Sequence, residues 1–350
     1  MLPVSDVDVI APNLKIRSSG VTSTIVQLVP RQAGEIGIAV IGPGLPRGLP
    51  RIPWWKLPLL LGRPRGRRVR IWHARRNVEM LAGLVLKAVL RAPLKLVFTS
   101  AAQRRHSGFT RFLMSRMDGV IATSRRSGGY LTVPHTVVMH GVDCDRFHPP
   151  AAPDDGFERA GLPGRHAIGC FGRVRHQKGT DLFVEAMLRL LPDFPEWTAV
   201  VTGRVTFLHR AFDRRLRDRI ARSGLERRIV FLGEVPDIRL WYRRLTLLVA
   251  PSRNEGFGLT PLEAMASRIA VVASDAGAYA ETVVDGETGA VVPAGDGDAL
   301  AEAIAGYMRD PQLALAHGRN GRDHVCRSFS IDREVNGIHA VYRRLWREGS

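Results

Sequence analysis

Two short stretches of this chain combine charged side chains with residues that interrupt helices. RNEGFGLTPLEAMA, residues 253–266, holds Glu255 and Glu263, and FGRVRHQKGT, residues 171–180, holds Arg173 and Lys178. Arginine suits two-point contact with phosphate and lysine supplies a compact charge, so this pair suits a diphosphate. A carboxylate beside a helix N-terminus suits acceptance of hydrogen bonds from sugar hydroxyls. The cations therefore predict a diphosphate site, with two solvated surface side chains as the alternative, and Glu255 predicts contact with sugar hydroxyls.

Glycines shape both stretches. Gly172 and Gly179 flank the two cations, and Gly256 and Gly258 keep the loop after Glu255 open. Glycine lets backbone amides approach an anion closely, above all where a helix begins. We therefore expect a phosphate to meet a run of loop amides, those of Phe257, Gly258, Leu259 and Thr260.

The start of the next helix gives Glu263 two readings. Pro261 fits the first helical position, so Thr260 is predicted to cap the helix and Glu263, three residues later, to complete a capping box. Glu263 then satisfies backbone donors, binds a ligand, or does both. A third loop, after the predicted strand 7–12, places Gly20 just before a helix, where its amides suit an anion.

The elements that must position these loops alternate between short β-branched runs and longer helical patterns. Helices are predicted at 21–32, 77–91 and 105–117, and the alternation favours parallel sheets with helices on both faces. A Pro-rich break at 147–156 separates two series of predicted strands. These are 7–12, 36–42, 68–73, 94–100, 119–124 and 135–141, then 167–172, 197–203, 228–233, 245–251, 269–274 and 289–293. A chain of 350 residues usually forms more than one domain, so we expect two doubly wound α/β domains facing across a cleft.

Charge is distributed unevenly along the chain. The net charge is +18, and residues 1–150 hold 23 Lys and Arg against 7 Asp and Glu, while the remaining residues hold 28 against 26. A basic first half favours an anionic partner such as phosphate, a lipid surface, an acidic glycan or nucleic acid. Within it, residues 51–70 place tryptophans and leucines beside arginines, which suits an anionic membrane surface; a buried helix with a solvated loop is the alternative.

Three cysteines, Cys144, Cys170 and Cys326, are too few and too scattered to predict a disulfide framework or a zinc site. We interpret them as small buried residues in a reducing compartment. Asp6 and Asp8 interrupt any amino-terminal leader, and charged residues and a proline break the most apolar long stretch, 81–98. A cytoplasmic protein is therefore expected, with possible placement at the inner face of the cytoplasmic membrane.

The pattern G-R-x4-K-G, followed about 75 residues later by E-G-F-G-x4-E-A-M-A, resembles the family 4 retaining glycosyltransferases of the GT-B fold. HGVDCDRFHP (140–149), VFLGEVPD (230–237) and the stretch 273–296 are similar to the same family. The segments IWHARRNVEML (71–81) and FTSAAQRRH (98–106) are most similar to bacterial lipopolysaccharide core mannosyltransferases. The resemblance covers nearly the whole second half and is weaker in the first.

The resemblance implies roles for individual residues. Arg173 and Lys178 match a pair that binds the donor's diphosphate, Glu255 a carboxylate that contacts the donor sugar, and Glu263 one that holds the ribose. Gly20 matches a glycine-rich loop near the phosphates, although this chain has Ser19 where the family often has a second glycine. The family works without a metal or other cofactor, so Asp143 and Asp145 are expected to cap a loop rather than bind an ion.

Two positions depart from the family pattern. Many members have a histidine at the end of the strand that here ends in Thr99 and Ser100. His73, at the end of the preceding predicted strand, is a candidate for the catalytic role of contacting the transferred sugar, with His106 the weaker candidate. A structural role for His73 is the alternative. Arg268 occupies a turn position that is usually glycine.

These inferences together predict a hexosyltransferase. Residues 1–150 are expected to bind the acceptor and residues 151–333 the nucleotide-sugar, with a helix at 334–350 returning to the first domain. The predicted reaction moves mannose from GDP-mannose, with retention, to an anionic lipid-linked lipopolysaccharide inner-core acceptor. The alternatives are another nucleotide-sugar for a different surface glycan, a sugar phosphorylase, and a non-catalytic nucleic-acid-binding protein, although no nucleic-acid partner is expected.

Overall fold

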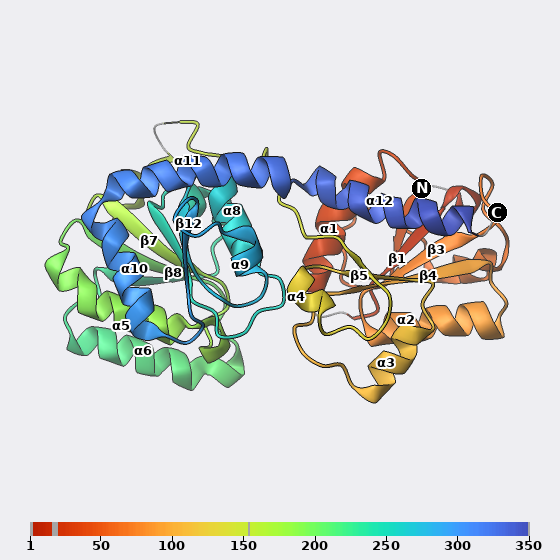
Figure 1. Cartoon of the computed structure of the whole chain (residues 1–350), viewed down its shortest axis with the longest axis horizontal. Helices are drawn as coiled ribbons and strands as arrows, with labels where there is room; N and C mark the ends of the chain where they lie inside the picture. Colours follow the sequence, from red (N-terminus) through yellow and green to blue (C-terminus); the bar gives the residue numbers. More distant parts are fainter. Residues whose placement is uncertain (1–2, 16–19, 153–154, 349–350) are drawn as a thin grey trace. The chain divides into compact units, whose positions relative to one another are not determined.

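The computed structural model describes residues 3–15, 20–152 and 155–348. It divides into two compact units (Figure 1), one formed by Met1–Met139 with Ile331–Ser350 and the other by His140–Ser330. The described part contains two sheets of six parallel strands each, and every strand coincides with a run predicted from the sequence. The predicted α/β class with two doubly wound sheets is confirmed.

The sheet of the first unit has the order β2-β1-β3-β4-β5-β6. Its strands are β1 (Val9–Pro12), β2 (Ile38–Ile41), β3 (Arg70–Ala74), β4 (Leu94–Ser100), β5 (Gly119–Ala122) and β6 (Thr136–Val137). Val9 pairs with both Ile38 and Ile71, so β1 lies between β2 and β3. All four residues of β1 and of β2 are buried. Continuous apolar runs of this kind are typical of strands covered on both faces.

Helices cover both faces of this first sheet. α1 (Gly20–Gln32) and α12 (Ile331–Arg347) lie side by side on one face in Figure 1 and share one apolar core with the strands. The other face carries a second core under α2 (Asn77–Leu84), α3 (Gly108–Ser115) and the 3-10 helix η2 (Trp54–Leu61). A π-helical turn, η3 (Val85–Val89), extends α2, and the remaining short helices are η1 (Val4–Asp6) and α4 (Arg125–Gly128).

The sheet of the second unit has the order β12-β11-β10-β7-β8-β9. Its strands are β7 (His166–Phe171), β8 (Trp197–Thr202), β9 (Ile229–Gly233), β10 (Leu247–Ala250), β11 (Ala270–Ser274) and β12 (Gly289–Val292). Its α-helices are α5 (Thr180–Leu190), α6 (Arg210–Arg222), α7 (Ile238–Arg243), α8 (Thr260–Ala266), α9 (Tyr279–Thr282), α10 (Gly297–Arg309) and α11 (Pro311–Ser328). Short 3-10 helices are η5 (Phe157–Ala160), η6 (His176–Lys178), η7 (Leu191–Asp193) and η8 (Phe207–His209).

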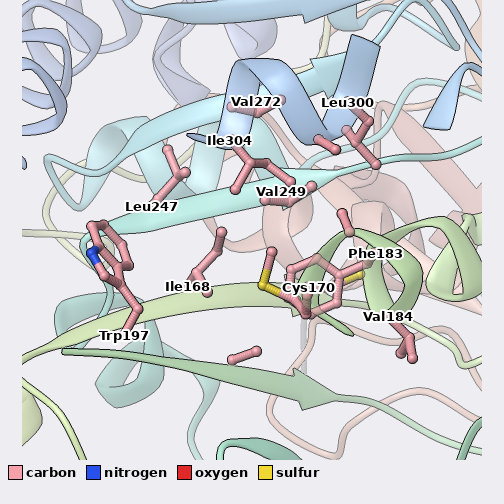
Figure 2. Close-up of a cluster of buried hydrophobic side chains, with 14 of the residues drawn as sticks. Ile168, Cys170, Phe183, Val184, Trp197, Leu247, Val249, Val272, Leu300 and Ile304 are labelled. Atoms are coloured by element: carbon pink, nitrogen blue, oxygen red, sulfur yellow. The ribbon is translucent and has the colours of Figure 1, made fainter. Parts of the chain in front are cut away.

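The core of the second unit forms where strands meet α5 and α10 (Figure 2). Ile168 and Cys170 lie two residues apart on β7 and therefore face the same side of the sheet, as do Leu247 and Val249 on β10. Phe183 of α5 is fully buried among them. Replacing a buried phenylalanine with alanine lowers the free energy of unfolding by about 3–5 kcal/mol. Packing of this strength holds β7 and β10 in fixed positions.

The unit boundary lies earlier than the Pro-rich break suggests. His140 begins the second unit, and the amide of Val142 donates to the carbonyl of Phe329 at 2.8 Å. The ring of Phe147 packs edge-on against Tyr242, with centroids 5.7 Å apart. Residues 140–150 therefore belong to the second unit, not to the first as predicted, and the last helix starts at Ile331 rather than at residue 334.

The expectation of three unpaired cysteines is wrong. Cys144 and Cys326 form a disulfide, with 6.0 Å between their Cα atoms, and only Cys170 is a free buried thiol in the described chain. The sequence separation of 182 residues gave no signal of pairing. The two residues meet because the segment after His140 packs beside the end of α11.

Candidate functional site

The second sheet changes its winding direction between β7 and β10. The chain runs outward from β7 through β8 to β9, then returns to the other side of β7 and runs from β10 through β11 to β12. Loops after the two central strands therefore leave toward opposite faces, and open α/β sheets bind their ligands in the crevice that such loops form beyond the carboxyl ends. The loop with Arg173 and Lys178 follows β7, and the loop with Glu255 follows β10.

Backbone and side-chain contacts hold these two loops together. The amide of Arg253 donates to the carbonyl of Gln177 at 2.9 Å, and its guanidinium pairs with Asp181 at 2.7 Å. Gly179 has φ of 68°, and a Cβ there would overlap the carbonyl oxygen of Pro251. Only glycine tolerates both conditions, so contact between the loops explains the glycine before α5.

Lys178 and Glu255 form an ion pair whose side chains are 19% and 15% exposed. The amide of Gly256 donates to Oε1 of Glu255 at 3.1 Å, and the Tyr279 hydroxyl lies 3.4 Å from Oε2. Burial alone would lower the pKa of Lys178, but interactions with Tyr279 and Glu255 outweigh it and raise the pKa above its usual value. Lys178 is therefore a fixed cation at neutral pH.

Arg173 lies on the same loop but is exposed. It directly follows Gly172, whose φ of 133° is one that only glycine adopts readily. The structure thus brings Lys178 and Glu255 into contact and places Arg173 at the surface beyond the end of β7. That contact joins the two predicted groups, cation and carboxylate, at the carboxyl ends of β7 and β10.

Glycines let the chain pack tightly around Glu255. Gly258 and Gly277 have φ of 87° and 64°, and a Cβ on Gly277 would come within 2.8 Å of both the Cβ of Glu255 and the carbonyl oxygen of Phe257. The Phe257 ring is buried edge-on against His140, at 4.9 Å between centroids. Phe257 is therefore a packing residue through its ring, which leaves its amide as the group available to a ligand.

The predicted capping box at α8 is wrong. Leu259 occupies the N-cap position, α8 begins at Thr260, and no side-chain cap bond forms there. The hydroxyl of Tyr242 donates to Oε2 of Glu263 at 2.6 Å. Burial raises the pKa of Glu263, an effect that the hydrogen bond from Tyr242 partly offsets. Glu263 therefore has no role in capping, and its carboxylate accepts from Tyr242 instead.

Comparison with known proteins shows the family to which the chain belongs. Residues 165–310 match the family described as glycosyl transferases group 1. The chain is 63% identical over 346 residues to a lipopolysaccharide core biosynthesis mannosyltransferase of Rhizobium leguminosarum bv. viciae, covering 99% of this chain and 98% of that protein. A protein of the same description from Rhizobium meliloti (strain 1021) is 53% identical over 353 residues, covering 99% and 100%. The chain belongs to this glycosyltransferase family.

The fold agrees with that assignment. The structure of the Anabaena protein HepE in complex with UDP and glucose superposes with a TM-score of 0.81 at 19% identity, covering 96% of this chain and 99% of that one. At this identity the likeness shows the fold alone. The predicted GT-B fold of this glycosyltransferase is confirmed.

In the first unit, His73 does not suit contact with a sugar. The side chain is 1% exposed, its Nδ1 lies 2.5 Å from the Tyr342 hydroxyl, and its Nε2 lies 2.6 Å from Oγ1 of Thr99. Burial, and then the charge of Arg75, hold its pKa well below the usual value. His73 is a neutral core residue that joins β3, β4 and α12, so its predicted catalytic role is corrected to a structural one.

His106 is the more accessible of the two histidines. It lies in the loop after β4, is half-buried, and has its Nε2 3.2 Å from Oγ of Ser100. Burial and the charge of Arg104 lower its pKa. By accessibility, His106 is therefore the better candidate for contact with the sugar, in contrast to the prediction from the sequence, which favoured His73.

Gly20 is the first residue of α1 and is exposed. Among the residues that the structure describes, no heavy atom lies within 4 Å of a Cβ built there. Residues 16–19 of the preceding loop, Ser19 included, lie outside the described residues. The predicted helix start at Gly20 is confirmed, and its contact with an anion stays a prediction.

The sequence patterns did not predict a polar cluster that lies at the switch point of the first sheet, between β1 and β3. The guanidinium of Arg76 pairs with Glu79 and donates to Oδ1 of Asn13, both at 2.7 Å, and also donates to the Thr22 hydroxyl at 3.1 Å. Glu79 is fully buried and accepts from the amide of Arg75 at 2.8 Å. The signal available in the sequence was Asn13 directly after a strand, and Arg76 and Glu79 one helical turn apart.

Asp143 fulfils the predicted loop-capping role, since its Oδ1 accepts from the amides of Asp145 and Arg146 at 3.1 Å each. Arg268 adopts φ of 66°, which explains why its position usually holds glycine. None of the described helices combines the length and apolar character needed to cross a membrane.

Proposed function

We propose that this glycosyltransferase is a retaining mannosyltransferase that transfers mannose from GDP-mannose to an inner-core lipopolysaccharide acceptor. The observation that carries the proposal is the contact of Lys178 with Glu255 at the switch point between β7 and β10. Support for the sugar and the pathway comes from two relatives named lipopolysaccharide core biosynthesis mannosyltransferases, which match this chain over nearly its whole length.

The cations of the β7 loop would hold the diphosphate. Lys178 is protonated and fixed, and Arg173 is exposed on the same loop with a planar guanidinium suited to two phosphate oxygens. A diphosphate entering the crevice competes with Glu255 for Lys178, which turns an internal ion pair into a contact with the ligand. We propose that these cations neutralise the charge of the diphosphate without a metal or other cofactor.

The carboxylates of the β10 loop would orient the rest of the donor. Glu255 is positioned to accept from mannose hydroxyls once Lys178 has turned to phosphate. Glu263, held by Tyr242 and half-buried on α8, would accept from the ribose hydroxyls. The amides from Phe257 to Thr260 precede α8 and Gly20 begins α1, so both positions offer backbone donors to phosphate.

The reaction breaks the bond between the anomeric carbon and the β-phosphate oxygen, and GDP leaves. An acceptor hydroxyl attacks the same face of the sugar, and its proton passes to a phosphate oxygen of the leaving GDP. Arg173 and Lys178 stabilise the negative charge that accumulates on that diphosphate. The products are GDP and a mannoside with the donor's anomeric configuration.

The first unit would bind the acceptor. Its basic character suits a core oligosaccharide that carries carboxylates and phosphates. The cluster of Arg76, Glu79 and Asn13 lies at the switch point of its sheet, where open α/β sheets bind ligands. We propose that the enzyme acts on the cytoplasmic side, in peripheral contact with the anionic inner face of the membrane through residues 51–70.

Thermal stabilisation by a panel of GDP-, UDP- and ADP-sugars, with chelator present, tests the donor site. A ligand at 100 times its Kd stabilises the folded state by about 2.7 kcal/mol, so a specific donor gives a clear shift in Tm. We expect GDP-mannose to give the largest shift, and the Glu263→Gln variant to reduce it. Equal shifts from every nucleotide-sugar, or none from GDP-mannose, would reject the proposed donor.

A further inference from the structure

Arginines from two distant segments surround a hollow of about 750 Å³ in the first unit. Arg63, Arg65 and Arg68 come from the loop after η2, and Arg343 and Arg347 from the last turns of α12. All five are exposed. Among the described residues that line the hollow there is no carboxylate. The proposed donor and acceptor sites make no use of this arginine pocket.

Arg67 and Trp346 also line the arginine pocket. The Arg67 guanidinium stacks 3.6 Å from the centroid of the Trp346 ring, and its Nε lies 3.5 Å from Oδ2 of Asp8. Trp346 is buried, so the stack joins the loop to α12. A packed contact between the loop and α12 therefore holds the two sides of the arginine pocket together.

The arginine pocket lies away from the ligand edge of the first sheet. Its loop leads into the amino end of β3, which starts at Arg70. The polar cluster of Asn13 and Arg76 follows the carboxyl ends of β1 and β3. The amino ends and the carboxyl ends of parallel strands lie on opposite sides of the sheet. The arginine pocket is therefore separate from the proposed acceptor site.

An exposed apolar helix directly precedes the arginine loop. In η2, Trp55 is 79% exposed and Leu59 56% exposed, and only Leu60 is buried. The alternative of a buried helix at this position is therefore wrong. Trp54 also lines an apolar groove of about 400 Å³ against α2 and η3. Tryptophan and leucine beside arginine are typical of segments that lie at a membrane interface.

A buried arginine fixes this apolar helix to the sheet. Arg70 donates to the carbonyls of Val7 and Val4 at 3.0 Å each, and to those of Leu60 and Gly62 at the end of η2. Burial lowers its pKa, and the charge of Asp8 partly offsets this. The end of η2 and the start of the arginine loop therefore have a fixed position relative to β3.

We propose that the arginine pocket binds the phosphate headgroups of anionic membrane lipids while the apolar side chains of η2 enter the interface. The inference rests on the membrane contact proposed above and assigns the headgroup contacts to α12 as well as to residues 51–70. Charge complementarity favours an anionic headgroup, and the exposed Trp55 favours a lipid over a soluble phosphate. The last helix thus completes a membrane-binding surface that begins near residue 54.

Vesicle co-sedimentation of the full chain at physiological salt tests this inference. The test variant is R343A/R347A, because alanine preserves α12, and the matched control is R214A/R215A on the exposed face of α6 in the other unit. Each arginine near an anionic surface contributes about 1 kcal/mol, so R343A/R347A should bind vesicles of phosphatidylcholine with phosphatidylglycerol about 30-fold more weakly. The control should bind as the unmodified protein does, and pure phosphatidylcholine should bind all three weakly.

Three results would overturn the inference. The first is equal weakening of R343A/R347A and R214A/R215A, which would indicate diffuse charge. The second is stabilisation by inorganic pyrophosphate without any vesicle binding, which would indicate a soluble phosphate ligand. The third is binding of a DNA duplex in place of vesicles. The Tm of each variant without ligand confirms folding. The Tm shift of the unmodified protein with GDP-mannose is a separate readout, because its absence rejects the proposed function without bearing on lipid binding.

Discussion

Replacing Lys178 with alanine should abolish most transfer while leaving the fold intact. Lys178 is protonated, is 19% exposed, and lies at the crevice between the loops after β7 and β10. In the proposed reaction it stabilises charge that develops on the leaving diphosphate. The change removes that stabilisation and, in the unliganded protein, the ion pair with Glu255.

The two losses differ in size. Removal of one preorganised group that stabilises transition-state charge costs about 2.7–4 kcal/mol, or about 100–1,000-fold in kcat. The ion pair is neither exposed nor fully buried, and Glu255 keeps its bond from the amide of Gly256 at 3.1 Å, so unfolding should become easier by only about 1–2 kcal/mol.

Initial rates of mannosyl transfer and thermal unfolding together check this prediction. Lys87→Ala is the matched control, because Lys87 pairs with Asp118 at 2.6 Å in the first unit, away from the crevice. We expect a similar small loss of stability in both variants and a large loss of kcat only in Lys178→Ala. Retention of a tenth or more of kcat by Lys178→Ala at saturating donor would refute the clamp.

Three further changes follow from the contacts of the site and the first core. Gly277→Ala forces a Cβ against Glu255 at positive φ, so we expect a loss of about 1–3 kcal/mol in unfolding free energy and weaker GDP-mannose binding by calorimetry. Glu263→Gln should raise KM for the donor about tenfold with little change in kcat. An equal decrease in kcat and in kcat/KM would contradict a ribose contact. Burial and the charge of Arg75 lower the pKa of His73 in the folded protein. Below about pH 6.5 the unfolded chain therefore binds more protons than the folded one, and Tm should decrease as the pH is lowered. His73→Gln should reduce that dependence, and an unchanged slope would show that other groups cause it.

The alternation of strands and helices could be predicted from the sequence because buried parallel strands have a strong apolar signal. Each strand of the structure lies within or beside a predicted run. The loops with Lys178 and Glu255 were also predictable, since glycines and charges after a strand are a local pattern. Their direct pairing was not, because it depends on which strands become neighbours across 77 residues.

The errors concern properties that only the packed chain determines. His73 has the sequence context of a strand-end histidine, but Tyr342 arrives from α12, 269 residues later, and occupies its Nδ1. The disulfide of Cys144 with Cys326 likewise needs the end of α11 beside the segment after His140. The arginine pocket needs α12 to return to the first unit, so no local stretch contains it.

Transfer from GDP-mannose to purified core-truncated lipopolysaccharide, in the presence of EDTA, tests the central claim most directly. The account predicts mannose incorporated into the acceptor with the anomeric configuration of the donor, and turnover that is insensitive to EDTA. Transfer from another nucleotide-sugar but not from GDP-mannose, or a product with inverted configuration, would contradict it.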